Sequence, residues 1–171
     1  MAGGAIASRG ESVQVSNCDF TYNTAESGGA IYILHGDLTI NEQSVIAYNV
    51  ATGAHTALTF GGGGIYIREN CSVVIGGGTL MFLNGASIGG GIYIEADGVL
   101  SVDSAEISQN EASYRGGGVY MDGTSTALFS VNTLISENSA PSGGDGISYD
   151  SELSSLSNLA TMVDDLADPR F

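Results

Sequence analysis

Short alternations of apolar and polar residues recur along the chain, and each follows a run of glycine. The pattern reads Gly-Gly-x, then aliphatic-Tyr-aliphatic in its four complete copies. Those copies and two degenerate ones occupy residues 3–8, 28–33, 62–67, 89–94, 116–121 and 144–149. A period of two puts the aliphatic residues on one face of a strand and the tyrosine on the other. Each copy therefore predicts a short strand whose aliphatic face enters a core.

A second motif, apolar-x-x-Asn, precedes each glycine pattern after the first. Its copies run from Phe20 to Asn23, Ile46 to Asn49, Met81 to Asn84, Ile107 to Asn110 and Ile135 to Asn138. A further alternating segment, such as Val13–Val15 or Leu100–Val102, lies before this motif in each repeat. About three short strands in roughly 25–28 residues are typical of a parallel β-solenoid, whereas propeller blades and helical repeats need longer units. The sequence predicts an all-β parallel β-helix of about six coils.

The asparagines of the second motif have a structural role in such a coil. An Asn side chain can bond its own turn and the Asn of the next coil, which satisfies polar groups at a buried corner. We expect a ladder of Asn23, Asn49, Asn84, Asn110 and Asn138. Ligand binding by these amides is the less favoured alternative.

The pairing of Phe20-x-x-Asn23 with Gly28-Gly29-Ala30-Ile31 resembles the repeat of the chlamydial polymorphic membrane proteins. That family carries many copies of FxxN and GGA(I/L/V), whereas the later coils here have Ile or Met for Phe and Gly for Ala. The resemblance covers about residues 3 to 149. It implies a right-handed parallel β-helix displayed outside the cell and used in adhesion. An extracellular or cell-surface location follows as an expectation, and an intracellular or organellar complex is the alternative.

The two ends of the chain differ from the repeats. Residues 1–149 are predicted to form the β-helix, and residues 150–171 a capping segment. Apolar residues from Leu153 to Leu166 recur near the helical period, which predicts a short helix over the last coil. The first glycine motif starts at residue 3, so we expect a longer solenoid or a neighbouring subunit at the N-terminal edge.

Composition narrows the classes of partner. The 171 residues contain 19 acidic and 4 basic side chains, all four of them arginine, for a formal net charge of -15. Nucleic-acid binding and docking to anionic lipid both need clustered cations, so neither is expected. No apolar run is long enough to predict a transmembrane helix. The expected partner is the surface of a protein or a glycan.

Two features are candidate binding surfaces. The tyrosines of the glycine pattern should line the outside of the rod as a stripe, although cross-rung stacking alone would also explain them. They are Tyr32, Tyr66, Tyr93 and Tyr120. A longer gap after Asn49 predicts an inserted loop, with Thr52, His55 and Thr56 as candidate contacts or as a tolerated surface insertion.

The sequence predicts no catalytic, cofactor or metal site. Arg68 and Arg115 could serve a pectate-lyase-like enzyme, but the acidic residues are scattered, and no zinc spacing or phosphate loop occurs. Cys18 and Cys71 are expected to be free thiols, and a disulfide between them is the alternative. The leading hypothesis is a non-enzymatic scaffold or adhesion module that presents a rigid face. The alternatives are a small structural subunit that docks through its N-terminal edge, and a carbohydrate-active enzyme.

Overall fold

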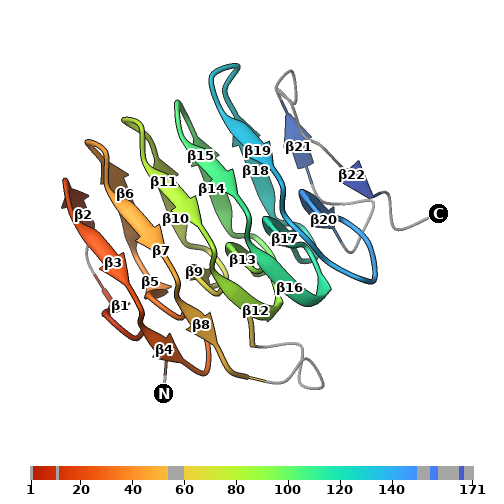
Figure 1. Cartoon of the computed structure of the whole chain (residues 1–171). Helices are drawn as coiled ribbons and strands as arrows, with labels where there is room; N and C mark the ends of the chain where they lie inside the picture. The colour runs from red at the N-terminus through yellow and green to blue at the C-terminus, as the bar shows by residue number, and fades with distance from the viewer. Residues whose placement is uncertain (1, 11, 54–59, 150–154, 158–165, 168–171) are drawn as a thin grey trace.

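The structure is a computed structural model that describes residues 2–10, 12–53, 60–149, 155–157 and 166–167. Its regular elements are short parallel strands, and no helix occurs within these ranges. The chain winds as a parallel β-solenoid of about 5 turns, with the strands of successive turns stacked side by side (Figure 1). The all-β parallel β-helix predicted from the repeats is therefore confirmed, with about five turns in place of six.

The strands form four parallel sheets that run along the axis. The first sheet contains β1 (Ile6–Arg9), β5 (Ile31–His35), β9 (Ile65–Ile67), β13 (Ile92–Ile94), β17 (Val119–Met121), β20 (Ile147–Tyr149) and β22 (Leu166–Ala167). The second contains β2 (Val13–Ser16), β6 (Asp37–Asn41), β10 (Ser72–Ile75), β14 (Val99–Val102), β18 (Thr126–Phe129) and β21 (Ser155–Ser157). The third contains β3 (Asp19–Thr21), β7 (Val45–Ala47), β11 (Leu80–Phe82), β15 (Glu106–Ser108) and β19 (Leu134–Ser136). The fourth contains β4 (Thr24–Ala25), β8 (Val50–Ala51), β12 (Gly85–Ile88) and β16 (Glu111–Arg115).

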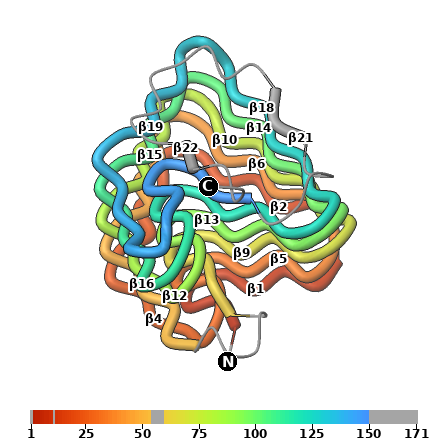
Figure 2. Tube along the Cα trace, turned by 90° about the vertical axis from the view of Figure 1, so that its right-hand side faces the viewer, coloured from red at the N-terminus to blue at the C-terminus, as the bar shows by residue number. Residues whose placement is uncertain are grey.

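The core is a set of aliphatic ladders inside the coil. In the first sheet the anchor of each glycine pattern pairs in register with the next, as Ile31 with Ile65 and Ile65 with Ile92. In the second sheet Val73 pairs with Leu38 below it and Leu100 above it. These side chains are fully buried, because strand alternation turns them inward at every turn. Seen along the axis, the turns superimpose closely (Figure 2).

The glycine pairs shape the corner between the fourth and first sheets. Gly62 has φ +66, a left-handed conformation that residues with a Cβ adopt at a cost. A Cβ on Gly63 would lie 2.3 Å from the carbonyl oxygen of Gly90 and 2.6 Å from the amide nitrogen of Gly85. The first glycine thus supplies the conformation, and the second allows the backbone to pass through a crowded corner.

The prediction of a C-terminal capping helix is wrong for residues 155–157 and 166–167, the described part of that segment. Ser155–Ser157 form β21, which pairs with β18, and Leu166–Ala167 form β22, which pairs with β20. The open edges of β18 and β20 offer backbone donors and acceptors, and this pairing outweighs a weak helical spacing of leucines. Both strands extend the solenoid's own sheets. The other positions of the predicted helix lie outside the described residues.

At the opposite end, strands β1, β2, β3 and β4 are each the terminal strand of their sheet. Each pairs with the corresponding strand of the next turn, namely β5, β6, β7 and β8. Strands β1 to β4 together form the N-terminal edge of the solenoid, where a neighbouring subunit was expected.

Candidate functional site

The five asparagines form one column at the corner between the third and fourth sheets. The side-chain Nδ2 of each of the first four donates to the Oδ1 of the next asparagine along the axis, at 2.9 to 3.0 Å. The backbone N–H of each donates to the same Oδ1. The members are Asn23, Asn49, Asn84, Asn110 and Asn138. Every asparagine after the first is buried, so these four amides act in the fold, and Asn23 alone is half-buried.

The tyrosines of the glycine pattern stack as expected, but they do not form an exposed stripe. Successive rings from Tyr32 to Tyr120 stack with centroids 4.8 to 5.2 Å apart. Tyr66, Tyr93 and Tyr120 are nevertheless only 1%, 1% and 3% exposed. They point out of the coil, yet Ile88 of β12 and Tyr114 of β16 pack against them. The expectation that these rings are exposed is wrong for Tyr66, Tyr93 and Tyr120, whereas Tyr32 is half-buried. The expectation equated the outward face of a strand with solvent.

Polar partners fix the buried phenols. Tyr66 donates to Glu95 Oε1 at 2.5 Å, and Arg68 Nε forms an ion pair with Glu95 Oε2 at 2.7 Å. Tyr93 donates to Asp122 Oδ2 at 3.4 Å. Burial raises the pKa of the Tyr66 phenol above its usual value, and the bond to Glu95 adds to this. Burial likewise raises the pKa of Tyr93. The rings of Tyr66 and Tyr93 are therefore buried with their hydroxyls bonded, while the Arg68 side chain stays 33% exposed.

The inserted loop can be followed at its start. Thr52 continues the ladder of the fourth sheet, since its backbone N–H donates to Ala25 O at 2.8 Å and its Oγ1 donates to the same oxygen at 3.2 Å. Its side chain remains exposed. His55 and Thr56 lie outside the described residues.

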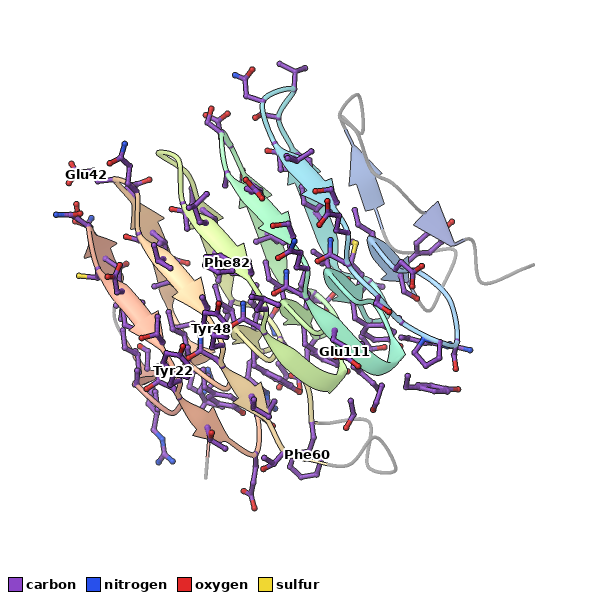
Figure 3. The ribbon with its side chains drawn as sticks, in the orientation of Figure 1. Tyr22, Glu42, Tyr48, Phe60, Phe82 and Glu111 are labelled. Atoms are coloured by element: carbon purple, nitrogen blue, oxygen red, sulfur yellow. The ribbon has the colours of Figure 1, made fainter. Side chains whose placement is uncertain are left out.

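An exposed apolar surface lies on the outside of the corner between the third and fourth sheets, directly before the asparagine ladder. We call it the apolar corner, and it consists of Tyr22, Tyr48, Leu80, Phe82 and Leu83. Tyr22 is 75% exposed, and Tyr48 and Leu83 are each 41% exposed. The rings of Tyr22 and Tyr48 stack at 4.9 Å and 7°, and Phe82 meets Tyr48 edge-on at 5.8 Å. Figure 3 shows the three labelled rings in a row across successive turns.

Backbone conformation makes this surface unusual. The residue before each ladder asparagine has a left-handed backbone, with φ 57 at Tyr22, 57 at Tyr48 and 54 at Leu83. Glycine or asparagine would adopt it with the least strain, whereas a bulky residue costs about 1–2 kcal/mol. The corresponding residues of the next two turns are the polar Gln109 and Glu137. Large apolar side chains at strained, exposed positions are candidates for function.

The sequence analysis did not predict the apolar corner, although the asparagine motif contains a pattern that indicates it. The third residue of the apolar-x-x-Asn motif is Tyr22, Tyr48 and Leu83 in three consecutive copies. The apolar anchor at the start of the motif and the asparagine at its end face inward. Two residues separate them, and the second of these, directly before the asparagine, lies at the tight corner and points away from the core. An aromatic at that position is therefore exposed.

A shallow groove continues from the apolar corner along the third sheet, over β11, β15 and β19. It has a volume of about 380 Å³. Leu80, Phe82 and Leu134 contribute apolar walls, and Glu106 and Glu137 contribute carboxylates. The apolar corner and the groove share Leu80 and Phe82, so they form one continuous surface.

The described residues contain neither a cluster of metal ligands nor a helix that could cross a membrane. In the part of the chain that the structure describes, no three His, Cys, Asp or Glu side chains gather closely enough to hold a metal ion. None of the described segments is a helix that could cross a membrane. No family model, curated protein or solved structure matches this chain. The geometry of the apolar corner and the groove is therefore the basis for the function proposed below.

Proposed function

We propose that this protein is a non-enzymatic recognition scaffold that binds a partner protein through the apolar corner. The observation that carries the proposal is the row of exposed, strained apolar side chains at Tyr22, Tyr48 and Leu83. Exposed aromatic clusters are enriched at protein interfaces, where they supply most of the binding energy. Adhesion at a cell surface, which the repeat resemblance implies, is one setting for such a scaffold.

A protein partner fits the ring arrangement better than a glycan. Sugars bind aromatic side chains mainly through open ring faces, whereas Tyr22 and Tyr48 cover one face of each other. The Tyr48 ring also meets Phe82 in an edge contact. The surface thus presents the open face of Tyr22 together with ring edges and the aliphatic Leu80 and Leu83, and this mixture suits the packed centre of a protein interface.

The test is a selection of binders from a displayed library of folded protein domains. The selected pool is measured against the wild-type chain and against the double variant Tyr22→Ser with Tyr48→Ser. The matched control is Leu128→Ser, which removes a similarly exposed apolar side chain from the second sheet. Circular dichroism and thermal melting verify that each variant folds.

We expect the dominant binders to lose at least about tenfold in affinity on the double variant and to retain it on Leu128→Ser. Binders that spread over the whole surface would contradict the proposal. A glycan array would also contradict the proposal if sugars bind the wild-type chain and the double variant Tyr22→Ser with Tyr48→Ser loses sugar binding but keeps its affinity for the selected proteins.

The proposal that the protein is not an enzyme is tested by a separate experiment. Glu106 and Glu137 lie in one groove, so a carbohydrate-active enzyme would place its acid chemistry there. A panel of acidic polysaccharides is screened for unsaturated products and new reducing ends. Turnover that disappears in Glu106→Gln would overturn the non-enzymatic part of the proposal.

Docking of a neighbouring subunit on the N-terminal edge stays a separate prediction. The native mass of the isolated material, with every co-purifying chain identified, checks it. A partner that contacts β1 to β4 and is unaffected by changes at Tyr22 and Tyr48 would favour that alternative.

A further inference from the structure

The groove beside the apolar corner has two kinds of wall. The apolar part comes from Leu80 and Phe82 of β11 on one side and from Leu134 of β19 on the other, and Glu106 of β15 pairs in register between Leu80 and Leu134. The other contribution is acidic and comes from Glu106 and Glu137. Its volume of about 380 Å³ lies near the lower end of the range for ligand pockets, so it suits a few side chains of an extended segment.

Neutral donors hold both carboxylates in place. Ser108 Oγ donates to Glu106 Oε1 at 2.6 Å, and Gln109 Nε2 donates to Glu137 Oε2 at 2.7 Å. A fixed carboxylate loses little freedom when it meets a second donor. The bonds from Ser108 and Gln109 have a charge on the acceptor alone, whereas a cationic donor adds a second, opposite charge and therefore bonds more strongly.

The net charge of the chain indicates that a partner should be positively charged. With 19 acidic and 4 basic side chains, the protein attracts cations over its surface and repels other acidic molecules. A second copy carries the same charge of -15, so self-association through this face is disfavoured. The complementary occupant is a basic segment of another protein.

We propose that the groove binds a lysine or arginine side chain of the partner, with its alkyl stem against Phe82 and Leu80. Long cationic side chains cover apolar surface with their methylenes while the charged head reaches a polar group. In the groove, the ammonium or guanidinium group reaches Glu106 or Glu137. Apolar residues of the same partner segment pack on Tyr48 and Tyr22. The inference rests on the proposed function, because it names the class of partner for the same surface.

The experiment uses three synthetic peptides of equal length and the full chain. In the first, lysine alternates with phenylalanine. In the second, glutamate replaces lysine, and in the third, serine replaces phenylalanine. Affinities are measured by titration calorimetry over a series of sodium chloride concentrations, with wild type, Glu106→Gln/Glu137→Gln and Tyr22→Ser/Tyr48→Ser. The charge control is Asp37→Asn/Asp97→Asn, which removes two exposed carboxylates away from the groove.

We expect only the lysine–phenylalanine peptide to bind wild type, with an affinity that falls as salt rises. Glu106→Gln/Glu137→Gln should weaken it about tenfold and flatten the salt dependence, whereas Asp37→Asn/Asp97→Asn should change it less than about twofold. Tyr22→Ser/Tyr48→Ser should weaken binding and leave the salt dependence in place.

Failure of this inference and failure of the proposed function give different results. If both carboxylate double variants weaken binding equally, the attraction is a general effect of net charge and the groove has no specific role. Absence of binding by the lysine–phenylalanine peptide, or equal binding of the glutamate peptide, also overturns the inference. In each case the library selection against Tyr22→Ser/Tyr48→Ser still decides whether the apolar corner binds a protein.

Discussion

Replacing Asn84 with alanine tests the structural role of the asparagine ladder at its centre. Asn84 is 1% exposed, and its side chain makes four hydrogen bonds. Its Oδ1 accepts from the backbone N–H of Asn49 at 3.1 Å and from Asn49 Nδ2 at 2.9 Å. Its Nδ2 donates to Ile46 O at 2.8 Å and to Asn110 Oδ1 at 2.9 Å.

The magnitude follows from the groups that lose their partner. Asn84→Ala leaves the backbone N–H and one side-chain N–H of Asn49 without an acceptor, and Asn49 is fully buried. Asn110 Oδ1 keeps the backbone N–H of residue 84. Each stranded buried donor costs about 1–3 kcal/mol, and relaxation at the corner recovers part of this. We expect the free energy of unfolding to fall by about 2–4 kcal/mol.

The assay is thermal unfolding followed by circular dichroism, with Asn23→Ala as the matched control. Asn23 begins the ladder, is half-buried, and donates one side-chain bond, to Asn49 Oδ1. The midpoint should fall by about 4–16 °C for Asn84→Ala and by at most about 4 °C for Asn23→Ala. Equal shifts in the two variants, or an unchanged midpoint in Asn84→Ala, would refute the reasoning.

Three further predictions concern the thiols, the glycine corner and the buried phenols. Iodoacetamide should label the exposed Cys18 of the native protein and spare Cys71, because burial hides this thiol and raises its pKa; equal labelling would contradict this. Gly63→Ala should cost about 3 kcal/mol or more by urea unfolding, because its Cβ would clash with backbone, whereas Gly10→Ala meets nothing within 4 Å and should be neutral. Above about pH 10 the thermal midpoint should fall, because burial raises the pKa of Tyr93 in the folded state and the unfolded phenol ionises first; Tyr93→Phe should reduce that fall.

Register along the solenoid axis could be predicted because two motifs fix it together. The aliphatic anchor and the asparagine each have one chemically suitable place in a coil, the core and the corner. Ile31 pairs with Ile65 and Asn49 bonds to Asn84 although an insertion separates these turns. The insertion changes the spacing along the chain and leaves the stacking unchanged.

Solvent exposure could not be predicted from alternation alone. Tyr93 lies on the outward face of its strand, and its burial depends on Ile88 and Tyr114, which come from a different sheet. The alternation of apolar and polar residues within one strand does not indicate which other segment packs on its outer face. The same limit applies at the apolar corner, where the chain turns and Tyr48 remains 41% exposed in the part of the chain that the structure describes.

The position of the apolar corner next to the asparagine ladder explains how an exposed surface can be rigid. Tyr48 and Leu83 directly precede Asn49 and Asn84, whose backbone and side chains are bonded to the neighbouring turns. The backbone N–H of Tyr48 also donates to Phe82 O, at 3.3 Å. Their left-handed conformations are therefore maintained by buried bonds, and the strain is present before any partner arrives. A surface held in this way loses little conformational entropy on binding, which raises affinity without additional contacts. Asn84→Ala should therefore weaken a partner that binds at Leu83 even at temperatures where the variant remains folded.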